Sequence, residues 1–285
     1  MAGDRPGWNM SFCGPEAVRR ATCLSEVAQV LAFAQAASDA GKWVVLALAY
    51  EAAPAFDAAL AAHALADFPL AYAAVYAAPC AAPPETPPET PPETSSGARG
   101  RYALSPWRPL ASRGRYRADL ERIRACLRSG ESYQVNYAMP FQAVFAGDSR
   151  AWFRDLQPRQ AAGYAAYADM GAHRVLCFSP ELFFQRRGRD MLVRPMKGTM
   201  PRGPGPDEDA ALAARLAACP KNRAENVMIV DLLRSDLGRV AETGSVRLEK
   251  LFTVEAYPTL WQMTSEISAR LRPGIGLMEI FQALF

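Results

Sequence analysis

The first part of the chain shows helical spacing followed by a short apolar run. Between Ser25 and Ala40, one face collects four apolar side chains, with Gly41 as the stop signal: Val27, Val30, Leu31 and Ala34. Ser25 is the expected N-cap of this helix. The run from Trp43 to Tyr50 is apolar throughout, and its flanks favour a buried strand, although periodicity alone does not separate strand from helix.

Helical spacing returns in three later segments. The first is an amphipathic helix closed by Gly130, and its apolar face holds Tyr116, Leu120, Ile123 and Leu127. The other two are expected at Asp207–Ala218 and at Pro220–Leu237, the latter with proline in its first turn and Gly238 as its stop. The inward face of the last helix is expected to hold Glu225, Met228, Ile229, Leu232 and Asp236.

Strand patterns are more numerous than helical ones after residue 130. We expect strands at 132–145, 163–169, 174–179, 191–195 and 245–254. Because several of them follow one another without an intervening helix, the pattern predicts an α+β fold with antiparallel sheet rather than a doubly wound βαβ fold.

Composition and charge narrow the class of protein. The 285 residues are 50% hydrophobic and 21% charged, which is typical of a globular chain. Lys and Arg number 32 against 29 Asp and Glu, which is too even for a nucleic-acid binder argued on charge. No apolar run reaches the ~18 residues of a membrane span. Residues 1–15 lack the apolar core of a signal peptide, so we expect a cytoplasmic protein.

Two further patterns are expected to be structural. Residues 83–94 repeat the tetrapeptide PPET, and proline this dense predicts an extended linker. The six cysteines have no CxxC spacing, so buried free thiols are expected and a zinc site is not.

Three polar clusters interrupt apolar sequence and are candidates for chemistry. They are residues 179–181, residues 195–203 and residues 223–236, which carry Glu181, Lys197 and Glu225 respectively. Each taken alone is more often a structural ion pair or a surface turn than a functional site. GxGxxG, Walker and HExxH patterns are absent from the sequence.

Four segments, in order along the chain, carry a resemblance to a known family: SGESYQVNYA (129–138), SPELFF (179–184), RPMKGTMPRG (194–203) and KNRAENVMIVDLLRSDLGRVAETGSV (221–246). They resemble the chorismate-utilising enzymes, and most closely the aminodeoxychorismate synthase component I branch. The resemblance implies large, mostly antiparallel sheets packed face to face with helices outside, as in anthranilate synthase component I. It also implies an N-terminal region at 1–80, a Pro-rich linker or loop at 81–100 and a chorismate-binding region at 112–285.

The same resemblance implies a reaction and its participants. Ammonia, supplied by a glutamine amidotransferase subunit (component II), replaces the C4 hydroxyl of chorismate, and Mg²⁺ holds the ring carboxylate. Lys197 stands where members with covalent catalysis have the lysine that adds to C2 of the ring. An attacking amine must be neutral, whereas the ordinary lysine pKa is about 10.4. Desolvation or nearby positive charge must therefore lower the pKa of Lys197, and Arg194 and Arg202 flank it.

Other positions match by the same resemblance. Glu181 matches the general acid/base, and Glu225 matches a Mg²⁺ ligand. Gln134, Thr199 and Arg202 are expected to support the substrate or ammonia site. Gln134 occupies the place of the lysine that activates water in isochorismate-forming relatives, which disfavours that activity.

Two alternatives stay open. Anthranilate synthase component I is disfavoured because its members have a small residue where Lys197 stands. The chain also ends at Phe285, before the Gly-rich loop, the second metal-binding glutamate and the carboxylate-binding arginine that the relatives have. A C-terminally truncated, inactive remnant is therefore the other expectation. Gln262 replaces a histidine that the family often has, and Gly163 replaces a proline.

Overall fold

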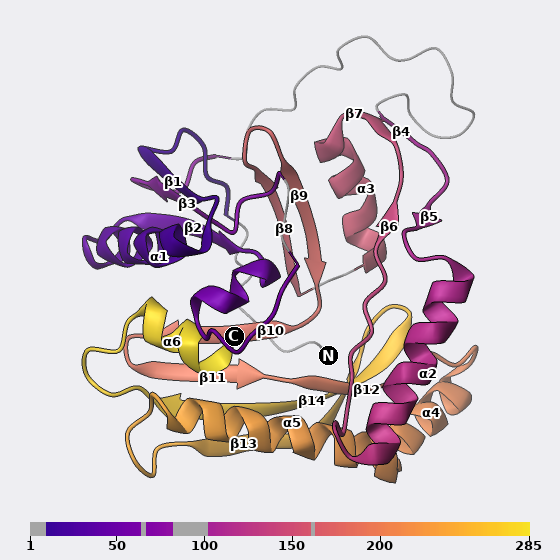
Figure 1. Ribbon diagram of the computed structural model, residues 1–285. Helices are drawn as coiled ribbons and strands as arrows, with labels where there is room; N and C mark the ends of the chain where they lie inside the picture. Colours follow the sequence, from indigo (N-terminus) through magenta and orange to yellow (C-terminus); the bar gives the residue numbers. More distant parts are fainter. Residues whose placement is uncertain (1–9, 64–66, 82–101, 161–162) are drawn as a thin grey trace. The chain divides into compact units, whose positions relative to one another are not determined.

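The computed structural model describes residues 10–63, 67–81, 102–160 and 163–285 (Figure 1). The PPET repeat at 83–94 lies outside these ranges. The chain forms two compact units, one of residues 1–85 and 159–285 and one of residues 86–158, and each is described by itself. Within the described ranges, no helix is both long enough and apolar enough to cross a membrane.

The larger unit begins with a three-stranded antiparallel sheet in the order β1-β3-β2. Its elements are β1 (Ala17–Ala21), α1 (Leu24–Asp39), β2 (Trp43–Leu48), a 3₁₀ turn (Tyr50–Ala55) and β3 (Ala71–Tyr76). The four predicted apolar side chains of α1 are buried, which confirms that face. The N-cap is Cys23 rather than Ser25. The helix begins early because the Glu26 carboxylate accepts from the backbone N–H groups of Thr22 and Cys23.

A five-stranded antiparallel sheet dominates the rest of this unit. Its order is β10-β11-β14-β12, with β13 also paired to β14. The strands are β10 (Leu182–Arg187), β11 (Asp190–Arg194), β12 (Met196–Pro201), β13 (Arg247–Ala256) and β14 (Leu260–Arg270). β11 and β12 are consecutive segments along one side of β14, separated only by Pro195, which has no N–H to donate.

Three helices accompany this sheet: α4 (Pro206–Ala218), α5 (Pro220–Gly238) and α6 (Leu277–Leu284). α5 lies along the sheet, and its side chains join a buried cluster with residues of β11, β14 and α6 (Figure 1). The buried stripe of α5 holds Asn226, Val230 and Leu237, with Leu233 partly buried. The predicted inward face is only partly right, because Leu232 is 55% exposed. Its other four members, Glu225, Met228, Ile229 and Asp236, are partly buried. The helix is apolar over a wide arc, so periodicity alone did not fix which side faces the sheet.

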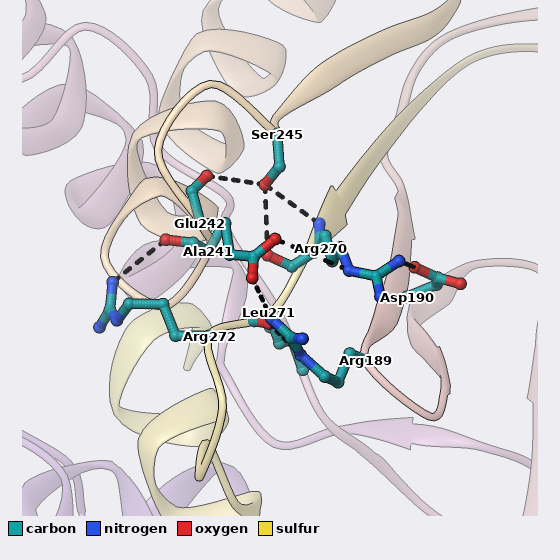
Figure 2. Close-up of polar contacts among 8 residues, drawn as sticks. All are labelled: Arg189, Asp190, Ala241, Glu242, Ser245, Arg270, Leu271 and Arg272. Atoms are coloured by element: carbon teal, nitrogen blue, oxygen red, sulfur yellow. Dashed lines mark hydrogen bonds and ion pairs between the residues drawn. The ribbon is translucent and has the colours of Figure 1, made fainter.

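A polar cluster fastens the end of the sheet where β14 finishes. The Arg189 guanidinium binds the Glu242 carboxylate and donates to the carbonyl of Leu271 at 2.9 Å (Figure 2). The Ser245 hydroxyl donates to the carbonyl of Glu242 at 2.8 Å, and Arg270 Nε lies 3.6 Å from Glu242 Oε2. These contacts join the β10–β11 turn, the end of β14 and the connection between α5 and β13.

Two of the predicted strands, at 163–169 and 174–179, are present in the same unit and pair with each other. β8 (Tyr164–Asp169) pairs with β9 (Arg174–Ser179), close to the expected ranges. Antiparallel sheets together with helices confirm the α+β class.

The smaller unit holds α2 (Arg113–Ser129), most of α3 (Ser149–Gln160) and four short strands: β4 (Tyr102–Leu104), β5 (Arg108–Pro109), β6 (Phe141–Gln142) and β7 (Phe145–Gly147). α2 ends at Gly130 in the left-handed conformation, as predicted. The long strand predicted at 132–145 was wrong, since only its last residues join short strands. Pro140 cannot donate to a ladder, and residues 132–140 pair with no strand of the described chain.

The cysteines also differ from the prediction. Cys13 and Cys80 form a disulfide, with their Cα atoms 6.2 Å apart. Tertiary pairing brings them together, because Ser11 and Cys80 form a β-bridge beside the β1–β3 ladder. Cys23 is exposed, and Cys126, Cys177 and Cys219 are partly buried rather than buried.

Candidate active site

Glu181 is held at the turn between β9 and β10 by both its backbone and its side chain. The Ser179 hydroxyl donates to the carbonyl of Glu181 at 3.0 Å and accepts from its N–H at 3.3 Å. The carboxylate Oε1 accepts from the backbone N–H of Met196 at 2.9 Å. The candidate acid is therefore fixed to the first residue of the strand that carries Lys197.

Lys197 lies in β12, one residue into the strand, and its side chain is partly buried. The strand predicted at 191–195 stops short of Lys197, whereas in the structure β12 begins at Met196 because β14 supplies its partners. Gly198 has φ +97°, and a Cβ built there would lie 3.0 Å from the Cβ of Asn222. Glycine at this position thus allows the first turn of α5 to approach the backbone beside Lys197.

A cavity of about 390 Å³ opens beside the Glu181 carboxylate. Its lining residues are Ser179, Glu181, Leu182, Phe183, Arg194, Pro195, Ile229 and Leu233. Ile229 and Leu233 lie one and two helical turns after Glu225 on α5. The cavity has largely apolar walls and two charged residues, Glu181 and Arg194, and neither Lys197 nor Glu225 is among its lining residues.

Carboxylates compensate the charge of Arg194. Its side chain is 2% exposed, binds the Glu255 carboxylate and places Nε 3.2 Å from Glu266 Oε1. The Lys250 ammonium approaches the other oxygen of Glu266 at 3.0 Å. Buried charges require this kind of pairing.

Arg202 is also paired with a carboxylate, that of Asp209, which accepts several hydrogen bonds. Asp209 accepts from Arg202 Nε at 2.8 Å, from the N–H of Gly203 at 2.9 Å and from Trp261 Nε1 at 2.8 Å. These donors, Arg202 first, hold the pKa of Asp209 well below its usual range. Arg202 also donates to the carbonyl of Tyr257 at 2.9 Å. Both arginines that flank Lys197 are therefore paired with carboxylates.

Glu225 is the candidate metal ligand, and it lies in the second turn of α5. Its side chain is 32% exposed, and Oε1 lies 3.7 Å from the Lys221 ammonium. In the described part of the chain, no group of three or more His, Cys, Asp or Glu residues is arranged to hold a metal ion. Mg²⁺ often takes only one or two protein carboxylates and completes its octahedron with water and substrate oxygens. Glu225 fits a site of that one-carboxylate kind.

The remaining predicted residues occupy two different settings. The Thr199 hydroxyl donates to Gln262 Oε1 at 2.9 Å across the β12–β14 pair. Gln134 belongs to the smaller unit, where its Oε1 is buried and has no hydrogen-bond partner in the described chain. An unpaired buried acceptor of this kind is uncommon in folded proteins.

Asn226 was missed by the sequence reasoning. It is fully buried, and its Oδ1 accepts from the Ser265 hydroxyl at 2.6 Å. The available signal was its position four residues before Val230 and eleven before Leu237, a spacing that places all three on one helix face.

The family model described as chorismate binding enzyme matches residues 2–285. Over 181 residues, the chain is 44% identical to aminodeoxychorismate synthase component 1 of Klebsiella aerogenes and 38% identical to that of Escherichia coli K12. Each match covers 64% of this chain and 40% of the relative, so the matched region is about two fifths of the relatives' length.

A solved structure supports the fold independently. The crystal structure of anthranilate synthase component I from Streptococcus pneumoniae TIGR4 aligns with a TM-score of 0.69 at 21% sequence identity, covering 86% of this chain and 60% of that one. At this identity the likeness concerns the fold. The family match over residues 2–285 shows that the chain belongs to the chorismate-binding enzyme family.

Proposed function

We propose that the chain carries the lysine-dependent part of an aminodeoxychorismate synthase component I, which converts chorismate and ammonia to 4-amino-4-deoxychorismate. The observation that supports this most directly is the attachment of the Glu181 carboxylate to the N–H of Met196, next to Lys197. The candidate acid, Glu181, is thereby bound to the backbone of the residue that precedes the candidate amine, Lys197. The identity of 38–44% to aminodeoxychorismate synthases over 181 residues supports this branch of the family.

The proposed chemistry uses this chain's own groups in two stages. The neutral Lys197 amine forms a bond to C2 of the ring while the C4–O bond breaks, and Glu181 donates its proton so that the hydroxyl leaves as water. Ammonia then forms the C4–N bond while the bond between Lys197 and C2 breaks, so that Lys197 leaves as the neutral amine and the new ammonium at C4 returns a proton to Glu181. The sum is chorismate plus ammonia giving aminodeoxychorismate plus water.

Glu225 would hold Mg²⁺, together with water and substrate oxygens. The metal would supply positive charge for the ring carboxylate of chorismate. The partly exposed carboxylate and the lack of a closed ligand cluster in the described chain suit a metal that is shared with substrate. Ammonia would come from a separate glutamine amidotransferase subunit, component II.

The test supplies the purified chain with chorismate, Mg²⁺ and an ammonium salt, and identifies products by liquid chromatography and mass spectrometry. We expect aminodeoxychorismate from the wild type and a loss of about 10²-fold or more for Lys197→Ala. Lys42→Ala is the matched control, because Lys42 pairs with Glu16 at the N-terminal sheet. Direct formation of anthranilate would reject the proposal and favour anthranilate synthase component I instead. Absence of any product, with no binding of chorismate in calorimetry, would favour the inactive remnant.

A further inference from the structure

Asn226 is the one fully buried polar residue on the sheet-facing stripe of α5 in the described chain. Its Oδ1 accepts from the Ser265 hydroxyl, whereas its Nδ2 is buried and has no hydrogen-bond partner among the described residues. Turning the amide over would only exchange which of the two atoms is unpaired. Since a buried unpaired polar atom is destabilising, an amide at this position calls for an explanation beyond stability.

Ser265 connects Asn226 to the strand of Lys197. The N–H of Ser265 donates to the carbonyl of Pro195 at 3.1 Å, two residues before Lys197. Its hydroxyl accepts from the N–H of Phe252 at 3.3 Å and donates to Asn226. One residue of β14 therefore links α5, β13 and the start of β12.

Phe252 marks the other side of this junction. It has φ 58°, the one non-glycine residue with positive φ in the described ranges, and it lies where the β13–β14 register shifts. The Arg223 guanidinium of α5 lies 4.3 Å from the centre of its ring. A left-handed phenylalanine costs free energy and persists only where its surroundings hold it in place.

We propose that Asn226 is a positioning residue that acts through Ser265 to hold the start of α5, with Glu225, against the strand that carries Lys197. A second contact also holds the start of α5 against β12, since Asn222 packs on Gly198 beside Lys197. The two contacts lie one helical turn apart on α5, on either side of Glu225 in sequence. The role of Asn226 in catalysis rests on the proposed function, whereas its effect on the position of α5 against β12 does not.

The first experiment measures geometry without substrate or metal. Lys197 and Lys42 are modified by trinitrobenzenesulfonate across a range of pH, and the rate at each lysine is read by peptide mass spectrometry. For Asn226→Ala we expect the ratio of the Lys197 rate to the Lys42 rate to rise by about threefold or more, because the start of β12 opens more often when the link from α5 through Ser265 is lost. Val230→Ala is the matched control, since it removes buried volume from the same stripe but no hydrogen bond. An unchanged ratio in Asn226→Ala would overturn the proposal.

The second experiment tests that the effect passes through one hydrogen bond. Ser265→Ala should raise the same ratio, and the double variant with Asn226→Ala should show little more than either single change. Additive effects of the two changes would contradict a shared pathway. Should Asn226→Ala not fold, Ser265→Ala alone carries the test, and an unchanged ratio in it overturns the proposal.

Kinetics separate this proposal from the proposed function. In active enzyme, Asn226→Ala should raise the Mg²⁺ concentration required for half-maximal rate by about tenfold, because the start of α5 would hold Glu225 less firmly in place. A wild type that makes no product while the labelling ratio changes would reject the proposed function and keep the positioning role. Conversely, the wild type could be active while Asn226→Ala alters neither the labelling ratio nor the Mg²⁺ requirement. That result would keep the proposed function and reject the positioning role.

Discussion

The Glu181 carboxylate and the backbone N–H of Met196 are joined by a hydrogen bond of 2.9 Å. The bond fixes the candidate acid to the residue that precedes Lys197. A glutamine side chain could accept the same bond, so this contact can be kept while the acidic proton is removed.

Glu181→Gln should therefore separate folding from catalysis. We expect the melting temperature to stay close to that of the wild type, and kcat for aminodeoxychorismate formation to fall by about 10²–10⁴-fold, the usual contribution of a general acid. Glu208→Gln, at an exposed position of α4, is the control and should keep its activity. A kcat for Glu181→Gln within about twofold of the wild type would exclude Glu181 as the acid.

Gly198→Ala should disturb the contact between β12 and α5. A Cβ at this residue meets Asn222, and φ +97° is unfavourable for alanine, so we expect the free energy of unfolding to fall by about 1–3 kcal/mol. Gly188→Ala is the comparison, because Gly188 has φ +59° but no atom within 4 Å of a built Cβ. Urea denaturation measures both variants, and an equal loss in the two would show that the contact with Asn222 adds nothing.

Asp209 should make stability depend on acid pH. Its pKa is lowered in the folded protein, chiefly by Arg202, so folding favours the ionised carboxylate. The stabilisation is therefore complete well above the unfolded pKa of about 3.9, and is lost as the pH falls below it toward the folded value. Asp209→Asn should be less stable than the wild type at pH 6, and the difference should shrink as the pH falls toward 3. Melting curves from pH 6 to pH 3 test this, with Asp207→Asn in the same exposed turn as control. A difference independent of pH would show that Asp209 acts only as a neutral acceptor.

Arg189 and Glu242 should stabilise the end of the larger sheet (Figure 2). Arg189→Ala removes this ion pair together with the bond to the carbonyl of Leu271, and we expect a loss of about 1–2 kcal/mol in the free energy of unfolding. Arg187→Ala, at an exposed position of β10, is the control. A double-mutant cycle with Glu242→Ala measures the coupling of the pair, and a coupling near zero would mean that the backbone contacts alone hold this end.

Local sequence determined the elements whose signals are complete within a few residues. The apolar face and glycine stop of α1, the Gly130 end of α2 and the strand at 174–179 were predicted and are present. The residues of the candidate site were also named from sequence, because long segments around Glu181, Lys197 and Glu225 resemble one family. Each of these inferences depended only on neighbours along the chain.

Tertiary structure decided what depends on partners distant in sequence. β12 mixes apolar and polar residues with a glycine and ends in proline, so its strand conformation depends on the hydrogen bonds that β14 supplies. The pairing of Cys13 with Cys80 and the burial of Asn226 against Ser265 likewise join residues 67 and 39 positions apart. α5 is apolar over a wide arc, and only contact with the sheet selects the buried side. The sequence by itself therefore determined the family and the candidate chemical groups, whereas packing decided how those groups are held, because hydrogen bonding and burial are settled between elements.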